Sequence, residues 1–102
     1  MSDTVIPLNR VPDKKEAQEI VRRLVAEEKI ALSSHTQQRM SQRRVSYHQI
    51  INCLKKGRIT EGPFQVKNGY EMRFERGTAG DWLRVVLCLR FKQDMLIISV
   101  IN

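Results

Sequence analysis

The sequence predicts an α+β fold in which helices come first and an antiparallel meander sheet follows. Two observations carry this prediction. The hydrophobic period is that of a helix up to about residue 57 and changes to the period of two of a strand afterwards. The segments with strand period are joined by short connections, which make neighbouring strands antiparallel. We expect one domain over 1–102, with an arm at 1–12, two to three helices within 13–57 and three to four strands within 58–102.

The first predicted helix begins at Asp13, which can cap it, and runs to about Lys29. Its apolar residues recur at the spacing of a single buried stripe. They are Ala17, Ile20, Val21, Leu24 and Val25. The opposite face is charged, so we expect this helix to lie on the surface with one side in the core.

Two shorter helices are predicted before residue 57. One is capped by Ser33 or Ser34 and continues to about residue 42. The other begins with Ser46 and Gln49, which match a capping box, and ends at Gly57. Its predicted apolar stripe consists of Tyr47, Ile50, Ile51 and Leu54.

Four strands are predicted after these helices, at about 64–66, 70–76, 82–91 and 95–101. Turn signals separate them: Gly62-Pro63 and Asn68-Gly69 bracket the first, and the later breaks are at residues 77–80 and 93–94. A two-residue turn at 93–94 would pair Lys92 with Met95 and place Leu87 opposite Val100. The apolar core face would then carry Leu87, Leu89 and Phe91 together with Leu96, Ile98 and Val100.

The same register argument makes a prediction for the polar face of the sheet. If Arg76 pairs with Asp81, then Tyr70, Met72 and Phe74 join the core face and Arg73 lies directly opposite Arg84. Like charges that oppose each other destabilise a sheet, so the pair predicts an anion site. The alternative is a surface salt-bridge ladder with Glu71 and Glu75.

Nearly all of the excess positive charge lies in one central stretch. The net charge is +7, and no Asp or Glu occurs between Lys29 and Thr60. The basic residues of this stretch are Lys29, Arg39, Arg43, Arg44, Lys55, Lys56 and Arg58. A basic tract without interleaved acids favours a surface that binds a polyanion, with Arg43, Arg44, Lys55, Lys56 and Arg58 as nucleic-acid contacts. A solvated basic surface is the alternative.

Several classes of protein are not indicated. Cys53 and Cys88 lie far apart and are too few for a disulfide scaffold, so we expect buried thiols in a reducing compartment. With His35 and His48 they match no zinc spacing, and neither a metal nor another cofactor is expected. No signal peptide is visible, and the longest apolar run, at 95–98, is far too short to span a bilayer. We expect a cytoplasmic protein.

The sharpest local feature is a histidine followed by arginines at helical spacing. His35, Arg39 and Arg43 are four residues apart and would line one face of a helix. Arginines at this spacing repel each other, so a phosphate-facing stripe explains them better than helix stability does. In the first turn the helix dipole disfavours a charged imidazole, so His35 can accept a proton. A capping or core-edge histidine is the alternative.

Residue types suited to RNA cleavage without a metal are present. Such cleavage needs a base for the 2′-hydroxyl, a cation for the crowded phosphorane and an acid for the leaving 5′-oxygen. The candidate catalytic residues are His35, Arg39, Arg73 and Arg84, with Tyr70 as a further candidate.

The run H-T-Q-Q-R-M-S-Q-R-R-V-S, the helix end K-K-G-R-I and the strands G-Y-E-M-R-F, L-R-V-V-L-C-L and L-I-I-S-V-I resemble a domain-of-unknown-function family. That family is grouped, by predicted fold, with the RelE-type and BrnT-type toxin ribonucleases. The resemblance covers residues 30–102 and implies a RelE-like fold, related to microbial ribonucleases, and a toxin-type activity on RNA.

The family motif reads His-Ala-x-x-Arg-Met, followed by a second arginine and, in the last strand, a threonine. By this resemblance the motif histidine is His35, the arginines are Arg39 and Arg43, and the last-strand hydroxyl is Ser99. The chain departs from the motif at Thr36, where alanine is usual, and at Ser99 itself.

Three functions remain open. The first is a toxin-type, metal-independent endoribonuclease that uses His35 and arginines. The second is a non-catalytic nucleic-acid-binding module on the same basic surface, although aromatic residues at 6% offer few stacking platforms. The third is a protein-interaction domain whose basic face meets an acidic partner such as an antitoxin-like protein.

Overall fold

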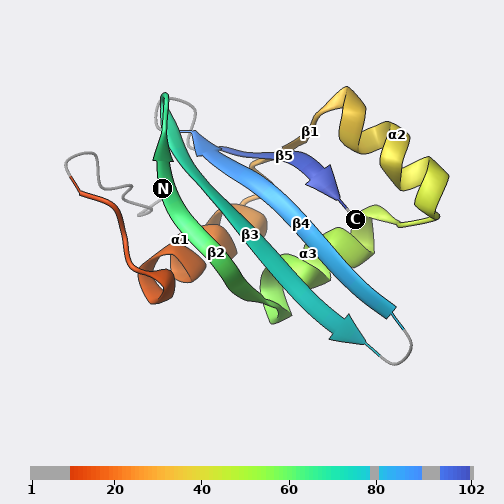
Figure 1. Cartoon of the computed structure of the whole chain (residues 1–102), viewed down its shortest axis with the longest axis horizontal. Helices are drawn as coiled ribbons and strands as arrows, with labels where there is room; N and C mark the ends of the chain where they lie inside the picture. The colour runs from red at the N-terminus through yellow and green to blue at the C-terminus, as the bar shows by residue number, and fades with distance from the viewer. Residues whose placement is uncertain (1–9, 79–80, 91–94, 102) are drawn as a thin grey trace.

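A computed structural model describes residues 10–78, 81–90 and 95–101 of the chain (Figure 1). The elements follow one another as α1 (Lys14–Ala26), β1 (Ile30–Leu32), α2 (Ser34–Arg43), α3 (Tyr47–Lys56), β2 (Arg58–Val66), β3 (Gly69–Thr78), β4 (Asp81–Arg90) and β5 (Met95–Ile101). Helices α1 and α3 lie together on one face of the sheet, whereas α2 packs beside β5. The predicted α+β class is confirmed, with helices first and the antiparallel meander β2 to β5 after them.

The helix starts are confirmed, because each has the capping residue that the sequence predicts. The Asp13 carboxylate accepts a hydrogen bond from the backbone N–H of Glu16 at 2.8 Å, and α1 follows. The Ser33 hydroxyl accepts from the N–H of Thr36 at the start of α2. Ser46 opens α3 with both hydrogen bonds of the capping box in place. These bonds satisfy N–H groups that have no partner inside the helix.

Helices α1 and α3 contribute one face each to the core. Every residue of the predicted α1 stripe is buried. In α3 the prediction is partly wrong: Ile50 and Leu54 are buried, but Tyr47 is 45% exposed and Cys53 is fully buried instead. Residues 50, 53 and 54 already make a stripe at the i, i+3, i+4 spacing, so the first turn need not reach the core.

The sheet has five strands in the order β1-β5-β4-β3-β2. Its edge strand β1 is parallel to β5, with Ile30 opposite Leu96 and Leu32 opposite Ile98, and was not predicted. Three residues are too few to show a period of two, and this strand exists only because β5 supplies its hydrogen-bonding partner.

Strand β2 is longer than expected and begins directly after α3. Gly62-Pro63, predicted to be a turn, lies inside it, at the shift in register with β3 between Glu61 and Phe64. Because β2 is the other edge of the sheet, a proline without an N–H breaks no bond to a further strand. The tight turn after β2 is made by Lys67 and Asn68, and Asn68 has a φ of 67°.

The two registers predicted from turn positions are each wrong by two residues. Arg90, rather than Lys92, pairs with Met95, so Leu87 lies opposite Ile98 and not Val100. The loop between them, 91–94, is outside the described residues, and so is Phe91. A shift of two residues keeps every side chain on its face. The assignment of Leu87, Leu89 and Ile98 to the core is therefore confirmed.

The β3–β4 hairpin closes on Thr78 and Asp81, so Glu75 lies opposite Arg84 and Arg73 lies opposite Val86. The predicted apposition of Arg73 and Arg84 is wrong. The face assignment again survives the shift: Tyr70, Met72 and Phe74 are buried beneath the helices in the same hydrophobic cluster as α1.

Candidate nucleic-acid interface

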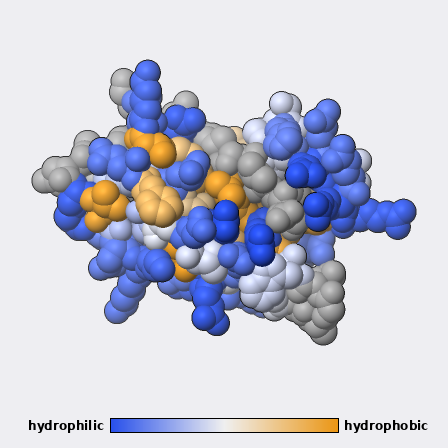
Figure 2. Space-filling view, viewed as in Figure 1, coloured by the Kyte–Doolittle hydropathy of each residue, from blue (hydrophilic) through white to orange (hydrophobic). Residues whose placement is uncertain are grey.

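The fold divides the basic stretch into two groups at opposite ends of α3. One group, which we call the α2 patch, consists of His35, Arg39, Arg43 and Arg44. The other gathers where α3 ends and β2 begins, at Lys55, Lys56 and Arg58. Helix α3 has 10 residues and is therefore about 15 Å long, and it separates Arg43 and Arg44, which precede it, from the second group at its end. Hydrophilic residues dominate the end of the molecule where α2 lies, at right in Figure 2.

The α2 patch is held in place by the start of its helix. The carbonyl of Ile98 in β5 accepts a hydrogen bond from the Ser33 N–H at 3.1 Å and a second one from the Thr36 hydroxyl at 2.8 Å. Thr36 is fully buried, whereas His35 next to it is exposed. Thr36 thus joins α2 to the sheet.

Among the described residues, no carboxylate forms an ion pair with the cations of the α2 patch. Arg43 and Arg44 are exposed, and Arg39 is half-buried. The Nε of Arg39 is buried and has no hydrogen-bond partner among the described residues. His35, Arg39 and Arg43 follow each other at four-residue spacing in an observed α-helix, as predicted.

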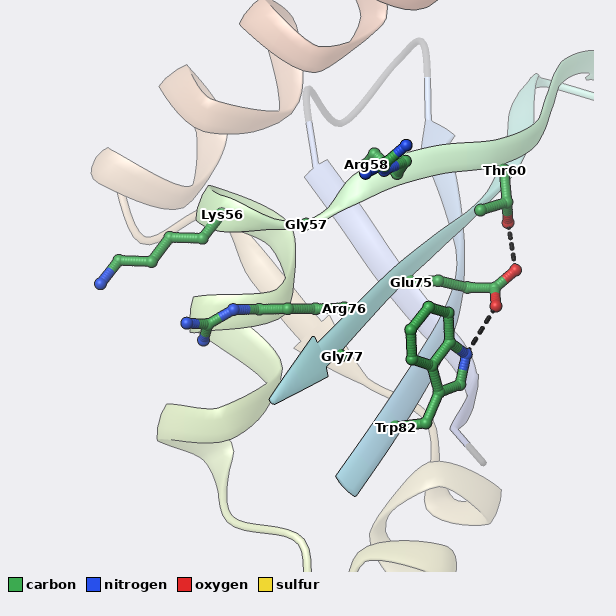
Figure 3. Close-up of a pocket in the computed structure, with 8 residues that line it drawn as sticks. All are labelled: Lys56, Gly57, Arg58, Thr60, Glu75, Arg76, Gly77 and Trp82. Carbon is green, nitrogen blue, oxygen red and sulfur yellow. Dashed lines mark hydrogen bonds between the residues drawn. The ribbon is translucent and has the colours of Figure 1, made fainter. Parts of the chain in front are cut away.

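The second group borders a pocket of about 550 Å³, which we call the Trp82 pocket (Figure 3). Its lining residues are Lys56, Gly57, Arg58, Thr60, Glu75, Arg76, Gly77 and Trp82. Gly57 lets the end of α3 approach β3 closely, because a Cβ at this position would lie 2.7 Å from the carbonyl oxygen of Glu75. Lys55 is exposed beside the pocket, and its carbonyl accepts a hydrogen bond from Arg22.

Glu75 organises the polar side of the Trp82 pocket. Its carboxylate accepts hydrogen bonds from the Thr60 hydroxyl and, at 2.7 Å, from the indole Nε1 of Trp82. The Nε of Arg84 lies 3.3 Å from the same carboxylate. The hydrogen bond from Thr60 and then that from Trp82, with the nearby guanidinium, lower the pKa of Glu75 below its ordinary value. The carboxylate is therefore ionised at neutral pH and fully engaged.

Trp82 is held along two edges of its ring. The Nε1 edge donates to Glu75, and the six-membered ring lies against Gly77, where a Cβ would fall 2.5 Å from Cζ3 and 2.6 Å from Cε3. Trp82 nevertheless remains 58% exposed. An indole fixed at its edges and exposed to this extent presents a ring face to solvent.

The predicted anion site between Arg73 and Arg84 is not present, because each arginine faces a carboxylate. Arg84 pairs with Glu75, as the alternative of a salt-bridge ladder required. Arg73 pairs with Glu61 of β2 at 3.2 Å rather than with Glu71. The two-residue difference in register places Arg84 opposite Glu75 instead of Arg73.

The remaining candidates do not join these arginines. Tyr70 lies on the opposite face, 1% exposed, and its hydroxyl donates a hydrogen bond to the carbonyl of Arg10. Ser99 belongs to β5, and its side chain lies outside the described residues. No hydrogen bond or ion pair links His35 or Arg39 to the polar face of the sheet within the described ranges.

Sequence reasoning missed the residues that complete the pocket, namely Thr60, Arg76, Gly77 and Trp82. Arg76 has the core-face parity of β3 but lies beyond the core, where it borders the pocket. One signal was available in the sequence: the single tryptophan of the chain falls on the polar face of its strand. Its partner across the hairpin, Gly77, could be identified only with the correct register.

The cysteines are free thiols, as predicted, and both are buried. Burial raises the pKa of Cys53 to about 12, and its Sγ lies 3.8 Å from the carbonyl oxygen of Leu83. Over the part of the chain that the structure describes, no cluster of three His, Cys, Asp or Glu residues could hold a metal ion. None of the described helices is long and apolar enough to cross a membrane.

Comparison with known proteins gives one match. The model of the family described as Domain of unknown function (DUF4258) matches residues 32–102, so the chain belongs to this family. The match includes α2, α3 and β2 to β5 and leaves out α1, although α1 supplies a full stripe of the core. No curated protein and no solved structure matches the chain significantly.

Proposed function

We propose that this DUF4258 protein binds RNA in the cytoplasm through the two basic groups at the ends of α3. The observation that carries the proposal is that the cations of the central stretch, Lys29 excepted, have no carboxylate partner in the described part of the chain. Arg73 and Arg84, outside this stretch, each face a glutamate. Uncompensated cations attract a polyanion, and binding gains from the release of its counterions.

A salt series tests this proposal with pairs of exposed residues. Each contact with a phosphate of a single strand contributes about −0.7 to the slope of log K against log salt. Arg43→Gln/Arg44→Gln and Lys55→Gln/Lys56→Gln should therefore each reduce the slope for single-stranded RNA by about 1.4 and weaken binding. The control is Lys14→Gln/Lys15→Gln, which removes two exposed cations of α1 and should leave the slope unchanged.

The result also separates RNA from an acidic protein partner. Polyglutamate at equal charge should compete for the protein far less effectively than RNA. If polyglutamate competes equally well, the surface recognises negative charge in general, and the protein-interaction function replaces the proposed one. If no variant differs from the control, the two basic groups are not the RNA-binding surface.

A second proposal is that the α2 patch cleaves the RNA, in the manner of a toxin-type endoribonuclease. The observation that favours it is that His35 is exposed one helical turn from Arg39, whose Nε is unpartnered among the described residues. The 2′-oxygen would attack the adjacent phosphorus while His35 takes its proton. The arginines would stabilise the phosphorane, and the bond to the 5′-oxygen would break, with water protonating that oxygen. The products are a 2′,3′-cyclic phosphate and a 5′-hydroxyl.

His35→Ala tests cleavage, with His48→Ala as the matched control because His48 is also an exposed helical histidine. In a buffer with a metal chelator, loss of the base should slow formation of cyclic phosphate ends by about 10²–10⁴-fold. Induced expression should stop growth for the wild type and the control but not for His35→Ala. Cleavage that survives in His35→Ala, or the absence of cleavage and growth arrest in the wild type, contradicts this second proposal without affecting RNA binding.

A further inference from the structure

We propose that the Trp82 pocket binds one nucleotide of single-stranded RNA, with its base stacked on the Trp82 indole and its phosphate held by Arg58. This inference rests on the proposed RNA binding and deepens it, because it assigns a site that recognises bases as well as charge. An aromatic face beside a positively charged groove is the arrangement by which proteins hold single strands without sequence preference.

The indole is suited to stacking because it is fixed before any ligand arrives. The hydrogen bond to Glu75 and the contact with Gly77 hold two edges of the ring, and 58% of the residue stays exposed. Glu75 is itself fixed by Thr60 and Arg84. A base that stacks on this ring therefore needs little rearrangement of the protein, which keeps the entropic cost of binding low.

Arg58 is the cation that can hold the phosphate beside the indole. Lys56, Arg58 and Arg76 all line the pocket, and none has a carboxylate partner among the described residues. Arg58 lies opposite Glu75, on the face of the sheet that carries Trp82, whereas Lys56 and Arg76 extend to the other side of β3, beside α3 (Figure 3). The single carboxylate of the pocket, that of Glu75, is already occupied by three neighbours. Arg58 therefore leaves an uncompensated positive charge on the face of the sheet that carries the Trp82 ring.

Among the described residues, the other exposed aromatic side chains lack this combination. Phe64 is as exposed as Trp82, at 56%, but it lies opposite Glu71 in the sheet and does not line the pocket. Tyr47 is exposed at the other end of α3. Phe64 therefore provides a matched control for an exposed ring outside the pocket.

Fluorescence tests the proposal directly, because Trp82 is the only tryptophan in the chain. A six-nucleotide single-stranded RNA should quench its emission in a saturable way. Polyphosphate, which has no bases, should cause little quenching at equal phosphate concentration. A duplex, whose bases are already stacked on each other, should also quench weakly.

Variants measure what the ring contributes. Trp82→Ala should weaken hexamer binding by about 5- to 150-fold, the range found when a stacking residue is removed. Trp82→Phe should retain most of the affinity, and Phe64→Ala should retain all of it. Arg58→Gln keeps the fluorophore and should weaken binding while leaving the quenching at saturation unchanged, even if Trp82→Ala does not fold.

These measurements distinguish stacking on Trp82 from charge-driven RNA binding. If RNA binds with the expected salt dependence but quenches no more than polyphosphate does, stacking is refuted and charge-driven RNA binding stands. If RNA does not bind at all, both proposals fail. If polyglutamate quenches the emission equally, the pocket binds an acidic protein segment rather than a nucleotide, and the inference is wrong.

Discussion

The α2 patch and the Trp82 pocket carry charge of the same sign but are built in different ways. The α2 patch takes its side chains from one helix, at a spacing of four residues that is visible in the sequence. The Trp82 pocket takes its side chains from α3, β2, β3 and β4, and they meet only because the strands pair in one register. A helical spacing is a local property, whereas a pocket at the end of a sheet depends on the whole fold.

The two regions also differ in what fixes them. The α2 patch depends on the start of its helix, where a buried threonine bonds to the backbone of β5. The pocket depends on the Glu75 carboxylate, which accepts hydrogen bonds from Thr60 of β2 and Trp82 of β4. It also depends on Gly77, against which the Trp82 ring packs. Substitutions at these supporting residues should therefore affect one region and leave the other unchanged.

The largest effect is expected for Gly57→Ala. The added methyl group would lie 2.4 Å from the carbonyl oxygen of Cys53 and 2.7 Å from that of Glu75, both of them backbone atoms. Helix α3 and β3 must move apart, so we expect the free energy of unfolding to fall by about 1–3 kcal/mol in urea denaturation. In the control Gly77→Ala the methyl group meets the Trp82 side chain, which can rotate away, so the loss should be smaller. If Gly57→Ala is as stable as the wild type, the close approach of α3 to β3 is refuted.

Thr36→Val should have an intermediate effect and act on the α2 patch alone. The change keeps the shape of the side chain but removes the hydroxyl that donates to Ile98. Because that carbonyl still accepts from the Ser33 N–H, we expect a loss of about 0.5–1.5 kcal/mol in thermal or urea unfolding. The emission of Trp82 should not change. A shift in that emission would mean that the two regions are coupled.

The smallest effect is expected for acidification of the Trp82 pocket. The pKa of Glu75 is lowered in the folded protein, so its contribution to stability is complete above its ordinary value of 4.5 and is lost as the pH falls through the folded value. Trp82 emission should stay constant down to about pH 4.5 and change below it, while far-ultraviolet circular dichroism is still native. Glu75→Gln should abolish this step. A step that persists in Glu75→Gln would assign the titration to another group.

Predictions from the sequence succeeded where neighbouring residues carry the signal. The caps at Asp13, Ser33 and Ser46 and the stripe of α1 depend on spacings of three or four residues. The core faces of β3, β4 and β5 follow from alternation alone, which is why they survived a wrong register. Of the candidate site, the α2 patch follows from the sequence in the same way.

Register, by contrast, depends on where each hairpin closes, and a turn signal locates this only to within a residue or two. That uncertainty led to the wrong pairing of Arg73 with Arg84 and concealed the meeting of Glu75, Arg84 and Trp82. It also concealed β1, whose three residues become a strand only beside β5.

By itself the sequence determined the fold class, the helix starts, the inward faces of β3 and β4 and the concentration of positive charge, because each depends on periodicity or composition along the chain. Only the tertiary structure decided that the charge divides between two ends of α3, that Glu75 neutralises Arg84, and that the single tryptophan is exposed on the same face of the sheet as Arg58. The physical reason is that these contacts join residues from different elements. Their distances depend on strand register and helix docking, which no local period encodes.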